Sequence, residues 1–259
     1  MTTEIDHYNL RGRHIVVTGA AQCVGRAIAQ AIVALGGRVI AVDVQEAPLR
    51  ELVSENDGKI IAAVGDVTDA AFAQQVVEQG VAQFGQVDGL VNNAAIVRPA
   101  MIEKMTRDQW DQVIAVNLTG PYTFLQAVGR HMIARRREDP EASGSIVNIT
   151  SDGGRRGSVG QINYSASKSG MLGITMSAAR EWGRYGIRVN TVSFGVVETP
   201  MSEVARSSKF RDAYLKEILL GRWASPQEVA RPVCFLLGNA SSYITGQHLS
   251  ASGGFHLTA

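Results

Sequence analysis

Short runs of apolar and β-branched residues alternate with longer amphipathic stretches along all 259 residues of this chain. The short runs are typical of buried strands, and the longer stretches have the apolar period of a helix. The predicted strands are His14–Thr18, Arg38–Val42, Lys59–Val64, Gly89–Asn92, Ser145–Thr150 and Arg188–Phe194. The predicted helices are Val24–Leu35, Ala70–Phe84, Arg107–Arg136, Gln161–Tyr185 and Pro226–Leu237.

The regular alternation of strand and helix predicts the fold class. A strand that is followed by a helix and a further strand favours a parallel sheet with helices on both faces. We therefore expect an α/β chain with a Rossmann-like, doubly wound and mostly parallel sheet. Gly36-Gly37, Gly85 and Gly186 fall where the predicted helices should stop. No linker or internal repeat interrupts the pattern, so residues 1–259 are expected to form a single domain.

Composition and charge exclude several classes of protein. Apolar residues make up 45% of the chain, and 25 basic residues against 24 acidic ones leave a net charge of +1, which predicts no nucleic-acid partner. Cys23 and Cys234 are too few for a disulfide framework, and no Cys/His cluster has the spacing of metal ligands. The polar segment Met1–Arg13 does not resemble a signal peptide, and no apolar stretch is long enough to span a membrane. We expect a cytoplasmic protein with no membrane partner and no metal.

Tyr164 and Lys168 are the most informative pair of residues, because they are four positions apart in a predicted helix and so share one face. A nearby ammonium favours the phenolate, which lowers the pKa of a tyrosine from its usual value of about 10. A tyrosine tuned in this way can act as a general acid or base. Ser151 follows a predicted strand and Asn117 lies within a predicted helix. Together these four residues predict an active site.

A glycine-containing turn, Thr18–Gly25, joins the first predicted strand to the first predicted helix. Glycine lets the backbone approach a pyrophosphate, whose charge a helix N-terminus favours. Asp43 ends the next strand, where a carboxylate accepts the ribose hydroxyls of NAD and repels the 2′-phosphate of NADP. Neither Val44 nor Gln45 is basic, and Gln22 adds no positive charge to the turn. We therefore expect NAD(H) to be preferred over NADP(H).

An ordered set of motifs follows the chain: the glycine turn, Asp66-Val67, Asn92–Ala95, Asn117, Ser151, Tyr164 and Lys168. On these residues the chain resembles the single-domain short-chain dehydrogenases/reductases from about Leu10 to Phe255. Within that family, Gly160–Tyr164 and Tyr243–Gly246 are similar to the beta-ketoacyl-acyl carrier protein reductases. The resemblance implies one dinucleotide-binding and catalytic domain, with a variable substrate loop at about residues 200–221.

The resemblance also implies a role for each catalytic residue. Ser151 would hydrogen-bond the substrate oxygen, and Tyr164 would give a proton to that oxygen or remove one. Lys168 would tune Tyr164 and bond the nicotinamide ribose. Asn117 would hold a water through its backbone as part of a proton relay.

Cofactor contacts follow from the same resemblance. Asp66 and Val67 would bracket the adenine, and Asn93 would steady the loop beside the adenosine ribose. Val197 and Thr199 would hold the nicotinamide carboxamide. The full expected set is Gly19, Gln22, Val24, Gly25, Asp43, Asp66, Val67, Asn93, Tyr164, Lys168, Val197 and Thr199.

Three positions depart from the family's pattern. Cys23 stands where the turn normally has glycine, and we expect it to weaken NAD affinity modestly without abolishing binding. Phe194 stands where proline is usual, which removes a fixed φ angle and adds an aromatic surface beside the expected nicotinamide site. Ser252 stands where aspartate is commoner.

The predicted activity is NAD(H)-dependent interconversion of a secondary alcohol and a ketone, with a small carbonyl or alcohol compound as substrate. The alternatives are a beta-ketoacyl-acyl carrier protein reductase that uses NADPH and a non-catalytic sensor of NAD. An epimerase or dehydratase of the extended family would need a separate substrate domain, for which the chain leaves little room. Arg98, Arg155 and Arg156 lie in the expected substrate loops, either as anchors for an anion or as solvated arginines. The resemblance further implies a homodimer or homotetramer that packs through residues 107–136 and 161–185.

Overall fold

The computed structural model describes residues 7–257, and its centre is a seven-stranded sheet in the order β3-β2-β1-β4-β5-β6-β7. Each neighbouring pair of strands in this sheet is parallel. The strands are β1 (His14–Thr18), β2 (Arg38–Asp43), β3 (Ile60–Val64), β4 (Gly89–Asn92), β5 (Gly144–Ser151), β6 (Ile187–Phe194) and β7 (His248–Ala251).

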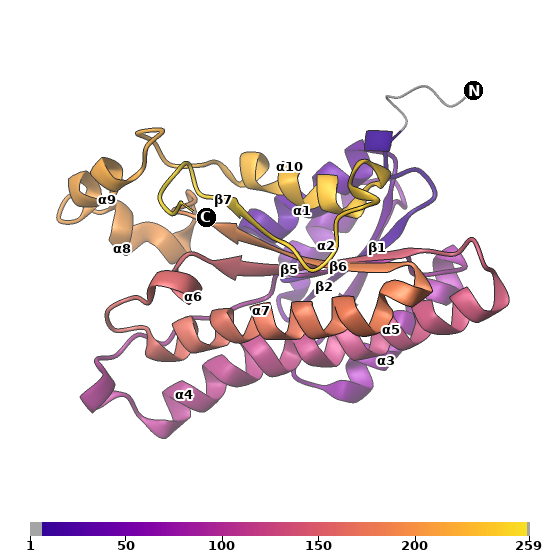
Figure 1. Ribbon diagram of the computed structural model, residues 1–259, viewed down its shortest axis with the longest axis horizontal. Helices are drawn as coiled ribbons and strands as arrows, with labels where there is room; N and C mark the ends of the chain where they lie inside the picture. Colours follow the sequence, from indigo (N-terminus) through magenta and orange to yellow (C-terminus); the bar gives the residue numbers. More distant parts are fainter. Residues whose placement is uncertain (1–6, 258–259) are drawn as a thin grey trace.

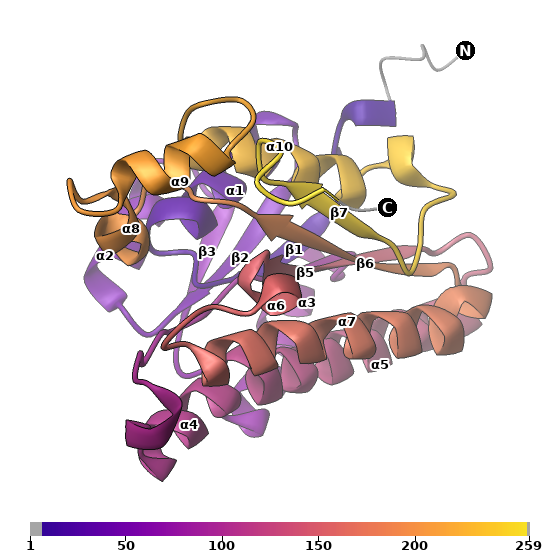
Figure 2. The ribbon, with the colours of Figure 1, turned by 60° about the vertical axis from the view of Figure 1, so that its left-hand side comes forward.

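Helices cover both faces of the sheet (Figure 1). On one face, α1 packs against α10, and α2 joins the same apolar core. On the other face, α5 packs against α3, and α7 runs alongside α5 in both ribbon views (Figures 1 and 2). The main helices are α1 (Cys23–Ala34), α2 (Glu46–Ser54), α3 (Ala70–Phe84), α4 (Arg107–Ile114), α5 (Gly120–Glu138), α7 (Ile162–Trp182) and α10 (Pro226–Leu237). The expected Rossmann-like, doubly wound sheet is confirmed, and its strands are parallel throughout.

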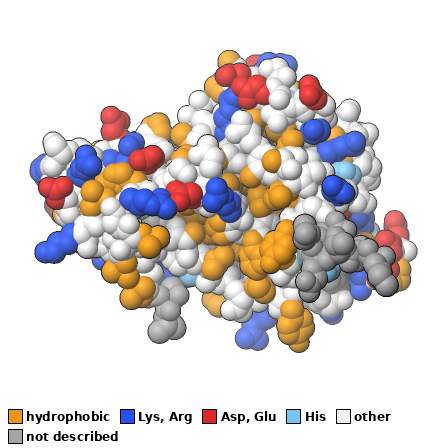
Figure 3. Space-filling view, turned by 90° about the horizontal axis from the view of Figure 1, so that it is seen from above, with side chains coloured by type: hydrophobic (Ala, Val, Ile, Leu, Met, Phe, Trp, Pro, Cys, Tyr) orange, Lys and Arg blue, Asp and Glu red, His pale blue; other side chains and the backbone are white. Residues whose placement is uncertain are grey.

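Short helical turns connect the main elements. They are η2 (Ile102–Lys104), α6 (Gly153–Arg156), η4 (Gly183–Tyr185), η5 (Pro200–Ser202), α8 (Glu203–Arg206), α9 (Arg211–Glu217) and η6 (Asn239–Ser241). The helices α8 and α9 lie within the expected substrate loop, and they bury none of their residues. Val204 and Leu219 are exposed in this region, which forms the left-hand end of the face shown in Figure 3. On that face positive and negative side chains lie interspersed.

The predicted helix 107–136 differs from the structure at one place. The segment is helical from α4 to the end of α5, but Ala115–Thr119 forms a π-helical turn, η3, between the two. Asn117 lies in this turn, is fully buried, and exchanges two hydrogen bonds with the backbone of Ile96. Turns of this kind are frequent at functional sites because they widen the helix and redirect a side chain.

Glycines end the predicted helices as expected. Gly85 closes α3 at φ +84°, and Gly186 follows η4 at φ +69°, so both take the left-handed conformation that glycine adopts without strain. Within residues 7–257, no helix combines the length and apolarity needed to cross a membrane.

A chain of buried polar side chains crosses the centre of the sheet. Asn92 at the end of β4 donates to Asn148 on β5 over 2.8 Å, and Asn148 donates to Thr175 on α7 over 2.8 Å. Asn148 is fully buried, so each of these hydrogen bonds satisfies a group that would otherwise be costly to remove from water. The chain fixes α7 against the strands, and α7 carries Tyr164 and Lys168.

Cys23 provides a test of local strain. It begins α1 at φ +49°, a region that costs a residue with a Cβ atom about 1–2 kcal/mol. Cys23→Gly should therefore have a free energy of unfolding about 1 kcal/mol larger than Cys23→Ala, because both variants remove the thiol and only alanine keeps the Cβ. Denaturant unfolding of the two variants measures the difference. Equal stability would contradict the assignment of strain to this position.

Candidate active site

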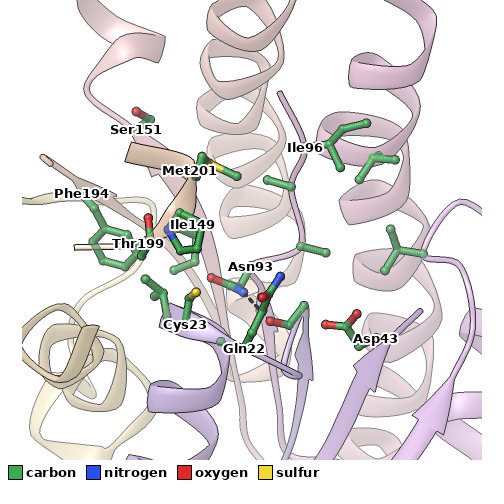
Figure 4. Close-up of a pocket in the computed structure, with 18 of the residues that line it drawn as sticks. Gln22, Cys23, Asp43, Asn93, Ile96, Ile149, Ser151, Phe194, Thr199 and Met201 are labelled. Atoms are coloured by element: carbon green, nitrogen blue, oxygen red, sulfur yellow. Dashed lines mark hydrogen bonds between the residues drawn. The ribbon is translucent and has the colours of Figure 1, made fainter. Parts of the chain in front are cut away.

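A cavity of about 600 Å³ lies outside the carboxyl ends of the parallel strands. It opens where β1 and β4 are neighbours and the chain leaves them toward opposite edges of the sheet, which is where open α/β sheets bind ligands. Figure 4 shows side chains converging on it from several elements, among them Gln22 and Cys23 from one side and Ser151 from another.

The glycine turn after β1 forms the floor of this cavity. A Cβ atom on Gly25 would overlap the carbonyl oxygen of Gly19, and one on Gly19 would lie 2.9 Å from the Cα of Ala94. Gln22 precedes α1 without capping it by a side-chain hydrogen bond, and the first turn of α1 carries no acidic residue. The backbone amides at the start of α1 therefore favour an anion in the cavity.

Thr18 and Asn93 tie the ends of β1 and β4 together. The Thr18 hydroxyl accepts from the backbone amides of Asn93 and Ala94 over 3.0 and 3.1 Å. The Asn93 side-chain amide donates to the carbonyl oxygens of Thr18 and Gly19 over 3.0 and 3.1 Å. Asn93 therefore steadies the turn.

Two carboxylates mark one end of the cavity. Asp43 is 8% exposed, and its carboxylate accepts from the backbone amides of Ala21 and Gln45 over 3.0 Å each. A carboxylate has about four acceptor positions, so capacity remains for a diol. Asp66 and Val67 line the same end, after β3.

Ser151, Tyr164 and Lys168 line the other end of the cavity. Ser151 ends β5, and its hydroxyl accepts from the backbone amide of Gly153 over 3.2 Å. The Lys168 ammonium donates to the carbonyl of Ile149 over 2.9 Å and lies 5.8 Å from the centroid of the Tyr164 ring.

The pKa of Tyr164 differs from the expectation. Burial raises it above the usual value, and the lowering contact is a hydrogen bond with Ser151 rather than the charge of Lys168. The physical reason is that the Lys168 ammonium is directed toward the Ile149 carbonyl and is itself removed from water, which lowers its own pKa to about 8.

Asn117 stands apart from the other expected catalytic residues. It does not line the cavity, although the adjacent Val116 does. Its side chain accepts from the Ile96 amide over 2.8 Å and donates to the Ile96 carbonyl over 2.9 Å. Asn117 therefore fixes the loop after β4, which forms one wall of the cavity.

The segment after β6 supplies the remaining wall. Val197 and Thr199 both line the cavity, and the Thr199 hydroxyl donates to the Val197 carbonyl over 3.4 Å. Phe194 lies on the same side of the cavity as Cys23 and is 8% exposed (Figure 4). Ser252 is buried and does not line the cavity.

Of the three loop arginines, only Arg98 lines the cavity. Arg156 instead pairs with Glu217 of α9 over 3.0 Å and donates to the carbonyl of Phe255 over 3.0 Å. It therefore joins the loop after Ser151 to the substrate loop and to the C-terminal segment. Spacing in the sequence gives no sign of these long-range contacts.

Sequence reasoning missed the buried carboxylate of Asp152, directly after Ser151. It is 2% exposed and accepts from the Ser193 hydroxyl over 2.9 Å, and burial raises its pKa. An acidic residue after a strand would have been the only signal. Residues 7–257 contain no group of three or more His, Cys, Asp or Glu side chains placed to hold a metal ion.

Comparison with known proteins places this architecture in a family. Residues 19–256 match the family model described as enoyl-(acyl carrier protein) reductase. The chain is 42% identical to the 3-oxoacyl-(acyl-carrier-protein) reductase FabG of Thermotoga maritima, over 95% of this chain and 98% of that relative. It is 37% identical to the D-threitol dehydrogenase of Mycolicibacterium smegmatis, over 96% of this chain and 94% of the relative.

A solved structure agrees with this placement. The gluconate 5-dehydrogenase of Burkholderia cenocepacia, in complex with NADP and tartrate, is similar with a TM-score of 0.91 and 30% identity, covering 98% of each chain. The chain therefore belongs to the short-chain dehydrogenase/reductase family, on the branch similar to the 3-oxoacyl-(acyl-carrier-protein) reductases, and is an oxidoreductase acting on CH–OH donors with NAD(P) as acceptor.

Proposed function

We propose that this chain is an NAD(H)-dependent oxidoreductase that interconverts a secondary alcohol and a ketone. The observation that supports this most is that one cavity has Asp43 at one end and the set Ser151, Tyr164 and Lys168 at the other. An elongated dinucleotide needs both ends, because its adenosine and its nicotinamide are separated by the pyrophosphate.

The residues present fit such a cofactor. Gly19 and Gly25 let the backbone of the turn approach a pyrophosphate, with the side chains of Gln22 and Cys23 beside it, and the uncapped start of α1 faces the same space. Asp43 would accept the two ribose hydroxyls, with Asp66 and Val67 beside the adenine. Val197 and Thr199 would contact the carboxamide. When bound, the nicotinamide supplies or accepts the hydride.

The protein's own residues then orient the substrate and move one proton. The Ser151 hydroxyl, at the end of β5, holds the substrate oxygen in place. The raised pKa of Tyr164 keeps the phenol protonated at neutral pH, so it can donate its proton to that oxygen during reduction. Because the charge of Lys168 does not lower the pKa of Tyr164, the role proposed for its ammonium, 5.8 Å from the ring centroid, is to bond the nicotinamide ribose. Asn117 contributes indirectly, because its hydrogen bonds to Ile96 fix the loop after β4 that forms one wall of the cavity.

We infer NAD(H) as the preferred cofactor from Asp43. Both of its oxygens are held by backbone amides, so the carboxylate cannot swing away from a 2′-phosphate. The charge would repel that group at close range. The solved gluconate 5-dehydrogenase contains NADP. The preference proposed here for NAD(H) therefore rests on Asp43 of this chain and not on that relative.

An alternative is a 3-oxoacyl-(acyl-carrier-protein) reductase that uses NADPH, which the 42% identity to the Thermotoga maritima reductase favours. The D-threitol and gluconate 5-dehydrogenase relatives favour a polyol or sugar-acid substrate instead. A non-catalytic sensor of NAD would not need Tyr164 and Lys168, and both are present.

Self-association is also proposed, through α5 and α7. Tyr122 on α5 is 49% exposed and Met176 on α7 is 53% exposed, so both helices present large apolar side chains to solvent. A homodimer or homotetramer would cover them.

Replacement of the catalytic tyrosine tests the reaction. Tyr164→Phe should lower kcat for ketone reduction roughly 10²–10⁴-fold, because the proton donor is lost, while the dissociation constant for NADH stays within about threefold. In the unaltered protein the reduction rate should fall as the pH rises past about 8, where Lys168 loses its charge. Tyr243→Phe, at a fully exposed position, is the control. Activity retained by Tyr164→Phe would contradict the mechanism.

A titration with NADH and NADPH, followed by nicotinamide fluorescence, tests the cofactor choice. NADH should bind at least tenfold more tightly than NADPH, and Asp43→Asn should remove most of that difference because it removes the charge. Glu46→Gln removes an equal charge on α2 outside the cavity and should change nothing. Cys23→Gly should tighten NADH binding modestly.

The opposite result would identify the alternative function. Preference for NADPH, together with rapid reduction of acetoacetyl-CoA, would replace the proposal with an acyl-thioester reductase. Turnover of simple secondary alcohols with NAD, and none of the thioester, would exclude that alternative.

Gel filtration tests self-association. The native mass should be at least twice the chain mass of 27.7 kDa. Met176→Glu should shift the protein toward the monomer, because it places a charge in the proposed apolar contact. An unaltered protein that elutes as a 27.7 kDa species would contradict the proposed contact.

A further inference from the structure

Charge is distributed unevenly along the cavity. Its two lining carboxylates, Asp43 and Asp66, lie at the end proposed for adenosine. Its two lining cations, Lys168 and Arg98, belong to the segments around the catalytic set, where no lining residue is acidic. The field at the reacting end therefore favours an anionic substrate over a neutral one.

The backbone of Arg98 is held close to the catalytic tyrosine. Its carbonyl accepts from the side-chain amide of Asn163 over 3.0 Å. The same Asn163 side chain accepts from the backbone amide of Tyr164 over 2.8 Å. One asparagine therefore fixes the relative positions of Arg98 and Tyr164.

The guanidinium of Arg98 is oriented by neutral groups. Its Nε donates to Gln112 on α4 over 2.9 Å, and Gln112 is held by Asp108 over 2.6 Å. Its Nη1 donates to the carbonyl of Val97 over 3.0 Å. Among residues 7–257, Nη2 has no hydrogen-bond partner and no carboxylate forms an ion pair with Arg98. Arg98 is an exposed residue, so its positive charge is oriented and unpaired where the cavity meets solvent.

We propose that Arg98 binds a carboxylate on the substrate, so that the enzyme acts on a hydroxy acid and the corresponding oxo acid. This inference rests on the proposed function, since it names the substrate class of the same site. A guanidinium with its Nε already occupied still presents Nη N–H groups that suit the planar carboxylate. One such cation neutralises a single negative charge, which favours a carboxylate over a phosphate dianion. An acyl thioester would bring no charge to Arg98.

Dead-end complexes test the assignment without turnover. Three- to six-carbon hydroxy acids and their methyl esters are titrated into the enzyme saturated with NADH, or with NADPH if that binds better. We expect the best acid to bind at least tenfold more tightly than its ester. Arg98→Gln should abolish the difference, and Arg98→Lys should retain part of it because the charge remains.

Two controls separate Arg98 from general effects. Arg107→Gln removes an exposed guanidinium of α4 that pairs with Asp111, outside the cavity, and should leave the acid preference unchanged. Cofactor affinity should be the same in all variants. Glycerol 3-phosphate is included as a phosphate probe and should bind more weakly than the acids.

The outcomes are distinct. Equal binding of acid and ester by the unaltered enzyme, or a preference that survives in Arg98→Gln, overturns the inference. Tighter binding of glycerol 3-phosphate overturns the choice of carboxylate. An acid that binds through Arg98 but is not oxidised with NAD or NADP supports Arg98 as the carboxylate site and contradicts the proposed function, and with it the assignment of hydroxy acids as substrates.

Discussion

The hydrogen bonds between Thr18 and Asn93 are the constraint on which the site depends. They join the ends of β1 and β4, the two strands from which the chain turns toward opposite edges of the sheet. Gly19 and Gly25 let the turn lie directly against these ends, because a Cβ atom on Gly19 would meet Ala94 and one on Gly25 would meet the carbonyl oxygen of Gly19. The Asn93 side-chain amide bonds that same carbonyl oxygen and holds the turn in place. The turn is thereby kept compact as the floor of a crevice outside the strand ends.

The parallel sheet brings the rest of the chemistry to that crevice. Each strand ends at the same edge, so Asp43 after β2 and Ser151 after β5 face one cavity although they are far apart in the sequence. Helix α7 adds Tyr164 and Lys168, and the buried hydrogen bond between Asn148 and Thr175 fixes its position against the strands. Asn117 and Asn163 do the same for the loop after β4. Buried amide side chains thus position groups that belong to separate elements.

Much of this could be predicted from the sequence, because buried parallel strands are short apolar runs and the expected cavity residues follow strand ends. Helix α2 was missed since Pro48 lies in its first turn and only Leu49 and Leu52 are buried. Strand β7 was missed because it is short and only partly buried.

The remaining differences depend on contacts between distant residues. The π-helical turn around Asn117 reflects its hydrogen bonds to Ile96, which no local pattern records. The direction of the Tyr164 pKa shift depends on burial, which a spacing of four residues does not reveal. For the same reason the sequence could not separate Arg98, which lines the cavity, from Arg156, which joins three segments.

The all-parallel sheet also has a consequence for folding, because none of its strand pairs can form as a hairpin. Ile15 on the central strand β1 pairs with Gly89 on β4, so this pairing must wait until the intervening chain has been made and collapsed. Pairings so distant in sequence are typical of slow folding. The newly synthesised N-terminal strands therefore spend a period with unpaired edges, during which assistance against aggregation matters most.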